Sequence, residues 1–246
     1  MRPIGFSTGA LALGDFRGAL AMLTDSDTKA VELSALRDHE LGPLMKAVRG
    51  LDLAQFTYVS IHAPSKFKTL TEAAVAAALQ PCIDLNIPLV IHPDVIREPS
   101  CWAVFGSLLC IENMDKRKRT GRTISELDQS FSIFPKATFC LDIAHARQMD
   151  STMTETRQML RRFGDRLRQV HISEIDAEGH HERLSLATIL ASQSIASLIN
   201  DDVPIIIESM IPAKVIKREI DAVRRALTPS AQEGAGWEYR DWGELA

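Results

Sequence analysis

Eight short apolar runs recur along the chain, and they constrain the fold more than any other feature. The runs occupy residues 3–8, 29–34, 56–62, 88–92, 108–112, 137–142, 168–172 and 203–208. Apolar runs of this length are typical of strands that are buried on both faces of a parallel sheet. Stretches of helical composition lie between them, including 69–85, 151–163 and 212–226. This alternation predicts an α/β fold with parallel strands and crossover helices.

The number of repeats and the length favour a closed barrel over an open sheet. The chain has 246 residues, and a (β/α)8 barrel typically has about 250. No change in composition and no Pro/Gly/Ser-rich linker divides it, so we predict a single (β/α)8 TIM barrel over residues 1–228. Residues 229–246 differ because they contain Trp237, Tyr239 and Trp242. We expect this aromatic tail to pack on the outside of the barrel; a substrate lid or a partner site is the alternative.

Charge and cysteine content argue against several classes of protein. The net charge of −4 gives no general attraction to nucleic acid or to an anionic membrane. No run reaches the roughly 18 apolar residues of a membrane span, and the N-terminus lacks the pattern of a secretory signal. The four cysteines form no CxxC pair. We therefore expect a reduced, cytoplasmic protein that does not bind membranes.

Residues of the types that bind metal ions stand at the ends of six of the expected strands. Parallel strands joined by right-handed crossovers end on one face of a barrel, and that face carries the active site. Imidazole and carboxylate groups are ligands of zinc, manganese and iron. A single histidine at a strand end is usually structural, whereas a full rim of such residues predicts a shared metal site. The candidates are His62, His92, Glu112, Asp142, His145, His171 and Glu208.

Three further residues extend this set and leave alternatives open. Glu178 and His180 follow the seventh strand two positions apart, and alternate residues of an extended segment face the same side. The sequence leaves His181 open as the alternative to His180. Glu32 ends the second strand and also faces the expected mouth, either as part of the site or as a residue behind it.

A basic run follows the fifth strand directly. The segment 115–122 reads DKRKRTGR and carries five cations on the face that should hold the active site. Such a run is either a solvated loop or a contact for an anionic substrate. Arginines beside the ligand motifs are further candidates. We predict substrate contacts from Lys116, Arg117, Arg119, Arg147 and Arg183.

Four motifs resemble those of the xylose-isomerase-like barrel superfamily, and within it most closely endonuclease IV. They are IEN at 111–113, LDIAHA at 141–146, EGHH at 178–181 and IIES at 206–209, and the resemblance covers about the whole chain. It implies a trinuclear centre. His62 and His92 would hold a first ion, with Glu112 bridging to a second that is completed by Asp142, His171 and Glu208. His145, Glu178 and His180 would hold the third, with glutamate at 178 where endonuclease IV has aspartate.

The resemblance and the ligand count favour a metal-dependent phosphoesterase. It would use two or three zinc or manganese ions, with Glu112, Glu208 and His145 as catalytic residues. We expect a small phosphorylated or nucleotide-like substrate, and DNA is less favoured because the loops are short and the charge is negative. The alternative is a sugar isomerase or epimerase with one ion on Glu112, Asp142, His171 and Glu208, in which the glutamates move a proton. A catalytically silent metal-binding subunit is disfavoured, because so many buried polar groups are unfavourable without a role.

Overall fold

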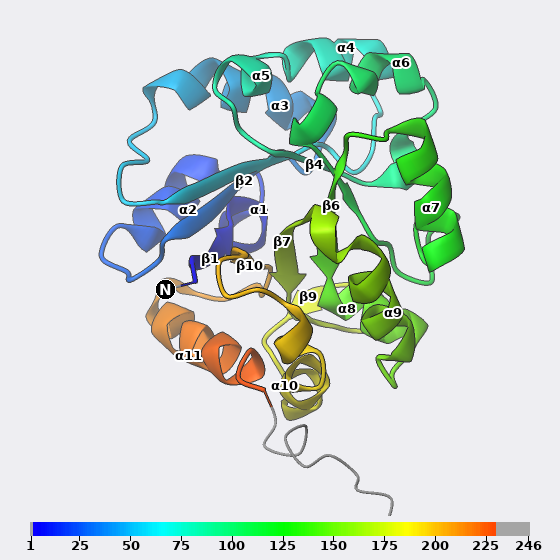
Figure 1. The fold of residues 1–246 in the computed structure, drawn as a ribbon. Coiled ribbons are helices and arrows are strands. Elements are labelled where there is room, and N and C mark those ends of the chain that lie inside the picture. The colour runs from blue at the N-terminus through cyan, green and yellow to red at the C-terminus, as the bar shows by residue number, and fades with distance from the viewer. Residues whose placement is uncertain (1, 230–246) are drawn as a thin grey trace, which may run out of the picture.

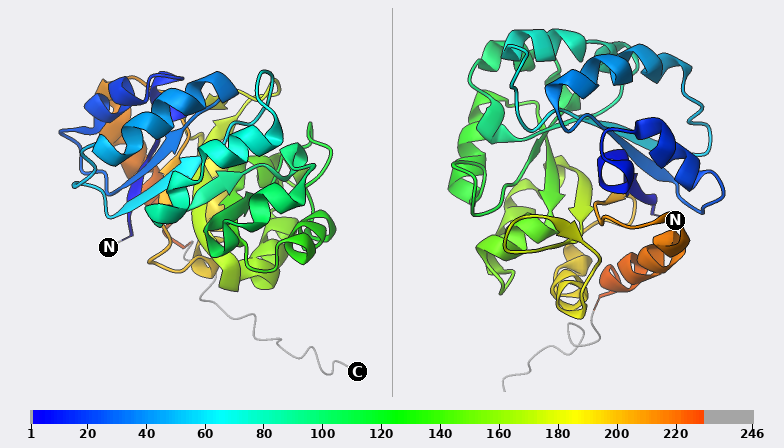
Figure 2. Two further views of the ribbon diagram at one scale, coloured as in Figure 1. Left: turned by 90° about the horizontal axis from the view of Figure 1, so that it is seen from above. Right: turned by 180° about the vertical axis from the view of Figure 1, so that it is seen from behind.

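A computed structural model describes residues 2–229 as a closed barrel of eight parallel strands inside a ring of helices (Figures 1 and 2). The order around the barrel is β1-β10-β7-β6-β5-β4-β3-β2. Every expected strand is present, so the predicted (β/α)8 barrel is confirmed. The strands are β1 (Ile4–Ser7), β2 (Ala30–Ser34), β3 (Tyr58–His62), β4 (Leu89–Ile91), β5 (Leu109–Glu112), β6 (Thr138–Asp142), β7 (Leu167–Ile172) and β10 (Ile205–Ile207).

Helices connect the strands and cover the outside of the barrel. The α-helices are α1 (Thr8–Ala12), α2 (Phe16–Leu23), α3 (Asp38–Ala47), α4 (Glu72–Ala78), α5 (Pro81–Asp84), α6 (Pro99–Ala103), α7 (Ile124–Ile133), α8 (Ile143–Met149), α9 (Thr154–Phe163), α10 (Leu186–Gln193) and α11 (Ile216–Ala226). Single 3-10 turns are η1 (Val48–Gly50), η2 (Pro93–Val95), η3 (Gly106–Leu108), η4 (Gly164–Arg166), η5 (Ala196–Leu198) and η6 (Ala213–Val215). A two-stranded hairpin, β8 (Glu174–Ile175) with β9 (His181–Glu182), follows β7 and was not expected from the sequence.

The three expected helices are present but shorter or divided. The stretch 69–85 splits into α4 and α5 at Pro81, which lacks an N–H for the continuing helix. The stretch 151–163 becomes helical only at Thr154, because Met153 adopts a left-handed conformation with φ of 60°. The stretch 212–226 begins with the 3-10 turn η6 before α11. Local backbone geometry therefore moved the boundaries without changing the order of elements.

The strands alternate between two environments. Ile61, Ile91, Ile111, Leu141 and Ile207 face outward and join the main apolar core between the barrel and the helices. The next residue of each strand faces inward, because side chains alternate across a strand. A separate buried apolar cluster is formed by Val90, Cys110 and Cys140. Each of them precedes an inward-facing candidate, His92, Glu112 or Asp142, by two residues. This cluster is a floor beneath the polar mouth.

The aromatic tail lies outside the described residues, and the expected absence of a membrane span can be examined only within them. Residues 230–246, which hold the tail aromatics, are not among the described residues, so the packing of the tail stays a prediction. Among residues 2–229, none of the helices combines the length and the apolar character needed to cross a membrane.

Two buried carboxylates fasten the loops around the mouth. Asp38, at the start of α3, accepts hydrogen bonds from the backbone N–H groups of Lys68, Thr69 and Leu70 at 2.7, 2.5 and 2.9 Å. Glu72, at the start of α4, accepts from the backbone N–H of Arg97 at 3.0 Å and from the indole of Trp102 at 2.6 Å. The loops after β3 and β4 are thereby tied to neighbouring helices, which limits their movement over the site.

We predict that Asp38→Asn lowers the free energy of unfolding at pH 7 by about 1–3 kcal/mol, since three donors lose their ionised acceptor. The backbone N–H groups, that of Thr69 first, hold the pKa of Asp38 well below its ordinary value. A lowered native pKa contributes stability above the unfolded pKa of about 3.9, and this stability is lost as pH falls through the native value. Urea unfolding should therefore show the difference at pH 7 shrinking below about pH 4. Equal stabilities at pH 7, measured beside the exposed control Asp25→Asn, would contradict this anchor.

Candidate metal centre at the barrel mouth

The seven strand-end candidates do converge at the C-terminal mouth of the barrel. A cavity of about 560 Å³ opens there, and His62, His92, Glu112, His145 and Glu208 line it. Asp142 and His171 are fully buried just beneath. The register explains this convergence, since Glu112 pairs with Cys140 and Asp142 pairs with His171 on adjacent strands.

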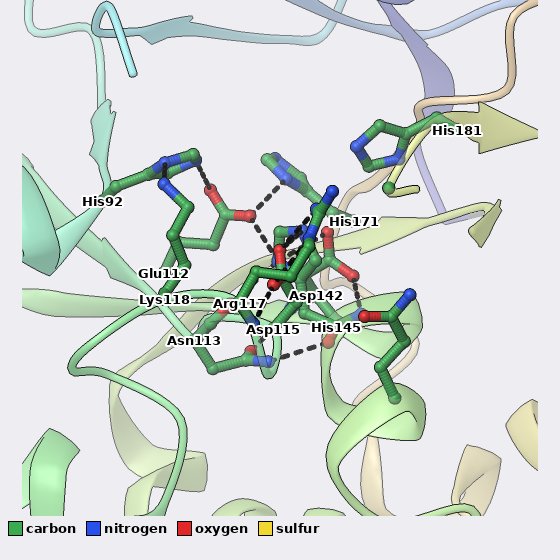
Figure 3. Close-up of polar contacts among 12 residues, drawn as sticks. His92, Glu112, Asn113, Asp115, Arg117, Lys118, Asp142, His145, His171 and His181 are labelled. Carbon is green, nitrogen blue, oxygen red and sulfur yellow. Dashed lines mark hydrogen bonds and ion pairs between the residues drawn. The ribbon is translucent and has the colours of Figure 1, made fainter. Parts of the chain in front are cut away.

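Glu112 is the centre of the cluster and is only 1% exposed. Its Oε2 lies 3.1 Å from Nε2 of His62 and 3.3 Å from Nε2 of His92. Its Oε1 lies 3.2 Å from Nδ1 of His145 and 3.6 Å from Nδ1 of His171 (Figure 3). Each oxygen of one carboxylate therefore faces its own pair of imidazoles, which is the arrangement expected of a bridging ligand.

Burial and mutual charge set the protonation of this cluster. Burial alone would raise the pKa of Glu112, but the charges of His92 and His171 bring it well below its ordinary value. Burial alone would lower the pKa of His62, but the hydrogen bond to Glu112 raises it to about 9. Burial, together with the charges of Glu208 and Glu112, raises the pKa of Asp142 to about 6. Without a cation from outside, the raised pKa values of His62 and His145 favour protons that offset the buried carboxylates, whereas burial lowers the pKa of His92.

Two orphaned atoms test whether a metal ion fits. Within residues 2–229, Oδ2 of Asp142 and Nδ1 of His171 are buried without a hydrogen-bond partner, and the nearest cationic group to Oδ2 is Nδ1 of His145 at 3.2 Å. Such atoms are unfavourable unless a partner binds them. Ligand atoms of Glu112, Asp142 and His171 lie within 4.8 Å of one another, as do those of His62, His92 and Glu112. The donor set therefore fits divalent ions, in two groups that share Glu112.

Backbone contacts orient the ligands. The ring of His62 contacts the carbonyl of Ala63 through Nδ1 at 2.7 Å, which directs Nε2 toward Glu112. Asp142 is the N-cap of α8, and its Oδ1 accepts from the backbone N–H of His145 at 2.8 Å. Asn113 clamps the same point by donating to the Asp142 carbonyl and accepting from its N–H. The three-residue spacing of Asp142 and His145 thus places both side chains at the mouth.

Glu32 lies below the cluster, fully buried. Its Oε2 accepts from Ser60 at 3.0 Å and from Gln169 at 2.7 Å, and lies 3.1 Å from Nε2 of His171. The Gln169 amide nitrogen also lies 2.7 Å from the same His171 nitrogen, so Nε2 is engaged below the cluster and Nδ1 remains on the side of Glu112. A ligand atom of Glu32 also lies within 4.8 Å of those of His171 and Glu208. The structure thus brings Glu32 next to the site.

The structure does not bring Glu178 and His180 to the mouth. Both are exposed, and the imidazole of His180 is paired with Asp176 at 2.9 Å. Asp176 closes a turn by accepting from the N–H groups of Gly179 and His180, and this turn shifts the alternation by one residue. His181 therefore points inward, with Nδ1 at 3.7 Å from Oε2 of Glu208. The inward side expected for Glu178 and His180 is therefore occupied by His181.

The predicted cations also separate into three groups. Among them, only Arg117 lines the cavity, together with Lys118 of the same run and Lys66 of the loop after β3. Lys116 and Arg119 are exposed and do not line it. Arg147 is bound to Glu174 at 2.6 Å, and Arg183 to Glu219 at 3.3 Å, so both are structural.

Sequence reasoning missed Lys66 and Asp115. Asp115 is 1% exposed and its Oδ2 lies 3.7 Å from Nε2 of His145. Its position directly after the IEN motif could have indicated it. Lys66 carries a weaker signal, because a single lysine in a short loop has no fixed direction.

Comparisons with known proteins agree with this fold. No family model and no curated protein matches the chain. Among solved structures, endonuclease IV from Thermus thermophilus matches with a TM-score of 0.61 and 19% identity over 95% of this chain and 100% of that one. A xylose isomerase domain protein from Alicyclobacillus acidocaldarius matches with a TM-score of 0.59 and 15% identity, over 92% of this chain and 99% of that one.

The third match is 3-keto-D-glucoside 4-epimerase from E. coli, with a TM-score of 0.57 and 12% identity over 91% of this chain and 99% of that one. The matched proteins thus include one named as an endonuclease and one named as an epimerase. At these identities the likeness concerns the fold. The expected resemblance is confirmed at that level: the chain shares the TIM-barrel fold of these proteins.

Proposed function

We propose that the chain is a metal-dependent hydrolase of phosphoesters that uses at least two divalent ions, zinc or manganese. The observation that carries the proposal is the position of Glu112 between two pairs of histidines. A site for one ion would need only the group around Asp142 and His171. His62 and His92 form a second group on the other oxygen of Glu112, and paired ions are typical of phosphoester hydrolysis.

The positions of the residues separate those that would hold the ions from those that would act on the substrate. Divalent ions at such a centre supply Lewis-acid polarisation of a phosphoryl oxygen and a more acidic water. Glu112, Asp142, His62, His92 and His171 would hold them. Three other groups would act on the substrate from the wall of the cavity: Glu208 as proton acceptor, with His145 and His181 as hydrogen-bond donors to the phosphoryl group.

Cations on the wall suit an anionic substrate of limited size. Lys66, Arg117 and Lys118 line the cavity, and Nζ of Lys118 lies 3.0 Å from Asp94 and 3.4 Å from His92. A cavity of about 560 Å³ holds a small phosphorylated or nucleotide-like molecule. The net charge of −4 makes duplex DNA the less favoured partner.

A sugar isomerase or epimerase is the second candidate function. It is favoured by the presence of Glu112, Asp142, His171 and Glu208 together, and by the match to a named epimerase. In that chemistry the two glutamates would move a proton at a carbon beside a carbonyl group. His62, at the end of β3, and His92, directly after β4, would then have no role in binding the ion.

We predict that Glu112→Gln loses at least one zinc equivalent per chain, because a neutral amide does not bridge two cations. Elemental analysis after equilibration with zinc and gel filtration would measure this loss. Glu126→Gln is the matched control. Glu126 lies on α7 and its side chain pairs with Arg122, so this variant should bind as much zinc as the wild type. Unchanged zinc content in Glu112→Gln would rule out the bridging role.

Neighbouring histidines offer a second matched pair. His181→Ala should lower kcat/KM for a phosphoester at least about tenfold, since its ring faces the cavity. His180→Ala should have no effect, because that side chain is 71% exposed and bound to Asp176. Steady-state kinetics on the two variants measures the difference. A larger loss in His180→Ala would restore the sequence-based assignment.

Parallel assays separate the two candidate functions. Hydrolysis of a chromogenic phosphomonoester or phosphodiester should appear, increase with zinc or manganese and disappear with chelator. His62→Ala and His92→Ala should abolish it, because each removes a ligand of the first ion. The isomerase function predicts no ester cleavage and metal-dependent interconversion of a ketose. Epimerisation that survives His62→Ala would overturn the hydrolase proposal.

A further inference from the structure

The third metal position implied by the resemblance lacks the carboxylate expected from residue 178. Glu178 is exposed and does not line the cavity. At the adjacent position the chain has Gly179, and there the guanidinium of Arg117 lies against the backbone. His145 and His181 remain at this end of the cavity, with ring centroids 5.9 Å apart. This side of the mouth therefore carries an arginine.

Arg117 is held in one position by a buried partner. Its Nε lies 3.0 Å from Oδ1 of Asp115, and its Nη2 lies 2.7 Å from Oδ2 (Figure 3). Its backbone N–H also donates to Oδ1 at 2.7 Å, and its Nη1 donates to the carbonyl of Glu178. The bidentate pair fixes the plane of the guanidinium, whereas a solvated arginine would be mobile.

Gly179 makes room for this guanidinium. A Cβ at position 179 would overlap Nη1 and Cζ of Arg117. The backbone at Gly179 also has a φ of +91°, which side-chain-bearing residues rarely adopt. A side chain at 179 and the observed Arg117 position therefore exclude each other.

The guanidinium keeps donors free for a ligand. An arginine side chain carries five N–H groups, and Asp115 and Glu178 engage three of them. The two that remain belong to Nη1 and Nη2, and two such N–H groups can bind two oxygens of a phosphoryl group. Arg117 is among the residues that line the cavity.

We propose that Arg117 takes the place of a third metal ion and binds the phosphoryl group of the substrate, so that the centre holds two ions. This inference rests on the proposed hydrolase function. In the reaction a water oxygen attacks phosphorus, the bond from phosphorus to the ester oxygen breaks, and a proton from the water passes to the departing oxygen. Arg117 stays protonated throughout and contributes fixed charge and hydrogen bonds.

Calorimetry with inorganic phosphate on the zinc-loaded protein tests the site without turnover. Arg117→Ala should weaken phosphate binding by roughly ten- to a hundredfold, the range for hydrogen bonds to charged groups. Arg117→Lys should recover only part of it, because a lysine lacks the fork. Arg119→Ala, in the same loop but outside the cavity lining, is the matched control and should bind phosphate as the wild type does. Equal affinities for wild type and Arg117→Ala would overturn the proposal.

Gly179→Ala displaces the guanidinium while the arginine is retained. It should weaken phosphate binding as Arg117→Ala does, and thermal unfolding would show that the variant is folded.

Millimolar guanidinium chloride should restore phosphate binding to Arg117→Ala, since the free cation can occupy the vacated position beside Asp115. An absence of rescue, or a third zinc ion per wild-type chain, would contradict the proposal. A wild type that binds phosphate through Arg117 but cleaves no phosphoester would refute only the hydrolase function.

Discussion

The rest of the site depends on one buried carboxylate that faces four imidazoles. Glu112 is nearly inaccessible to water, yet each of its oxygens lies within about 3.6 Å of two histidines. Burying so much charge is unfavourable unless opposite charge compensates it. The raised pKa values of His62 and His145 favour protonated imidazoles that offset this charge, and the orphaned atoms of Asp142 and His171 suit the divalent ions that we propose.

The barrel provides the conditions for that cluster. Asp142 and His171 are register partners on adjacent parallel strands, and the carboxylate of Glu112 at the end of β5 lies beside them. The apolar floor of Val90, Cys110 and Cys140 closes the interior below, so the polar groups open only toward the mouth. Loops above are fastened by carboxylates at helix starts, and the loop after β5 is fixed through Asp115. Strand register therefore sets the positions of the ligands, and the loops set which cations can reach a substrate.

The amino-acid sequence was sufficient to predict the barrel and the convergence of the strand-end residues at its mouth. Apolar runs repeat with the βα period, and strand ends of a parallel barrel share one face whatever the details of packing. Loop residues were less predictable. The choice between His180 and His181 depended on a turn closed by Asp176, and the direction of Arg117 on a glycine far away in the chain. Helix boundaries shifted at Pro81 and Met153, where a single residue ended or delayed the helix.

Anomalous X-ray diffraction from crystals of the zinc-loaded protein tests the central claim most directly. The account predicts two zinc peaks, one beside His62 and His92 and one beside Asp142 and His171, with Glu112 in contact with both. It also predicts that the guanidinium of Arg117 remains beside Asp115 and that no third peak lies between His145 and His181. A single peak beside Asp142 and His171, with His62 and His92 unliganded, would contradict a shared two-ion centre and would support the one-ion chemistry of an isomerase.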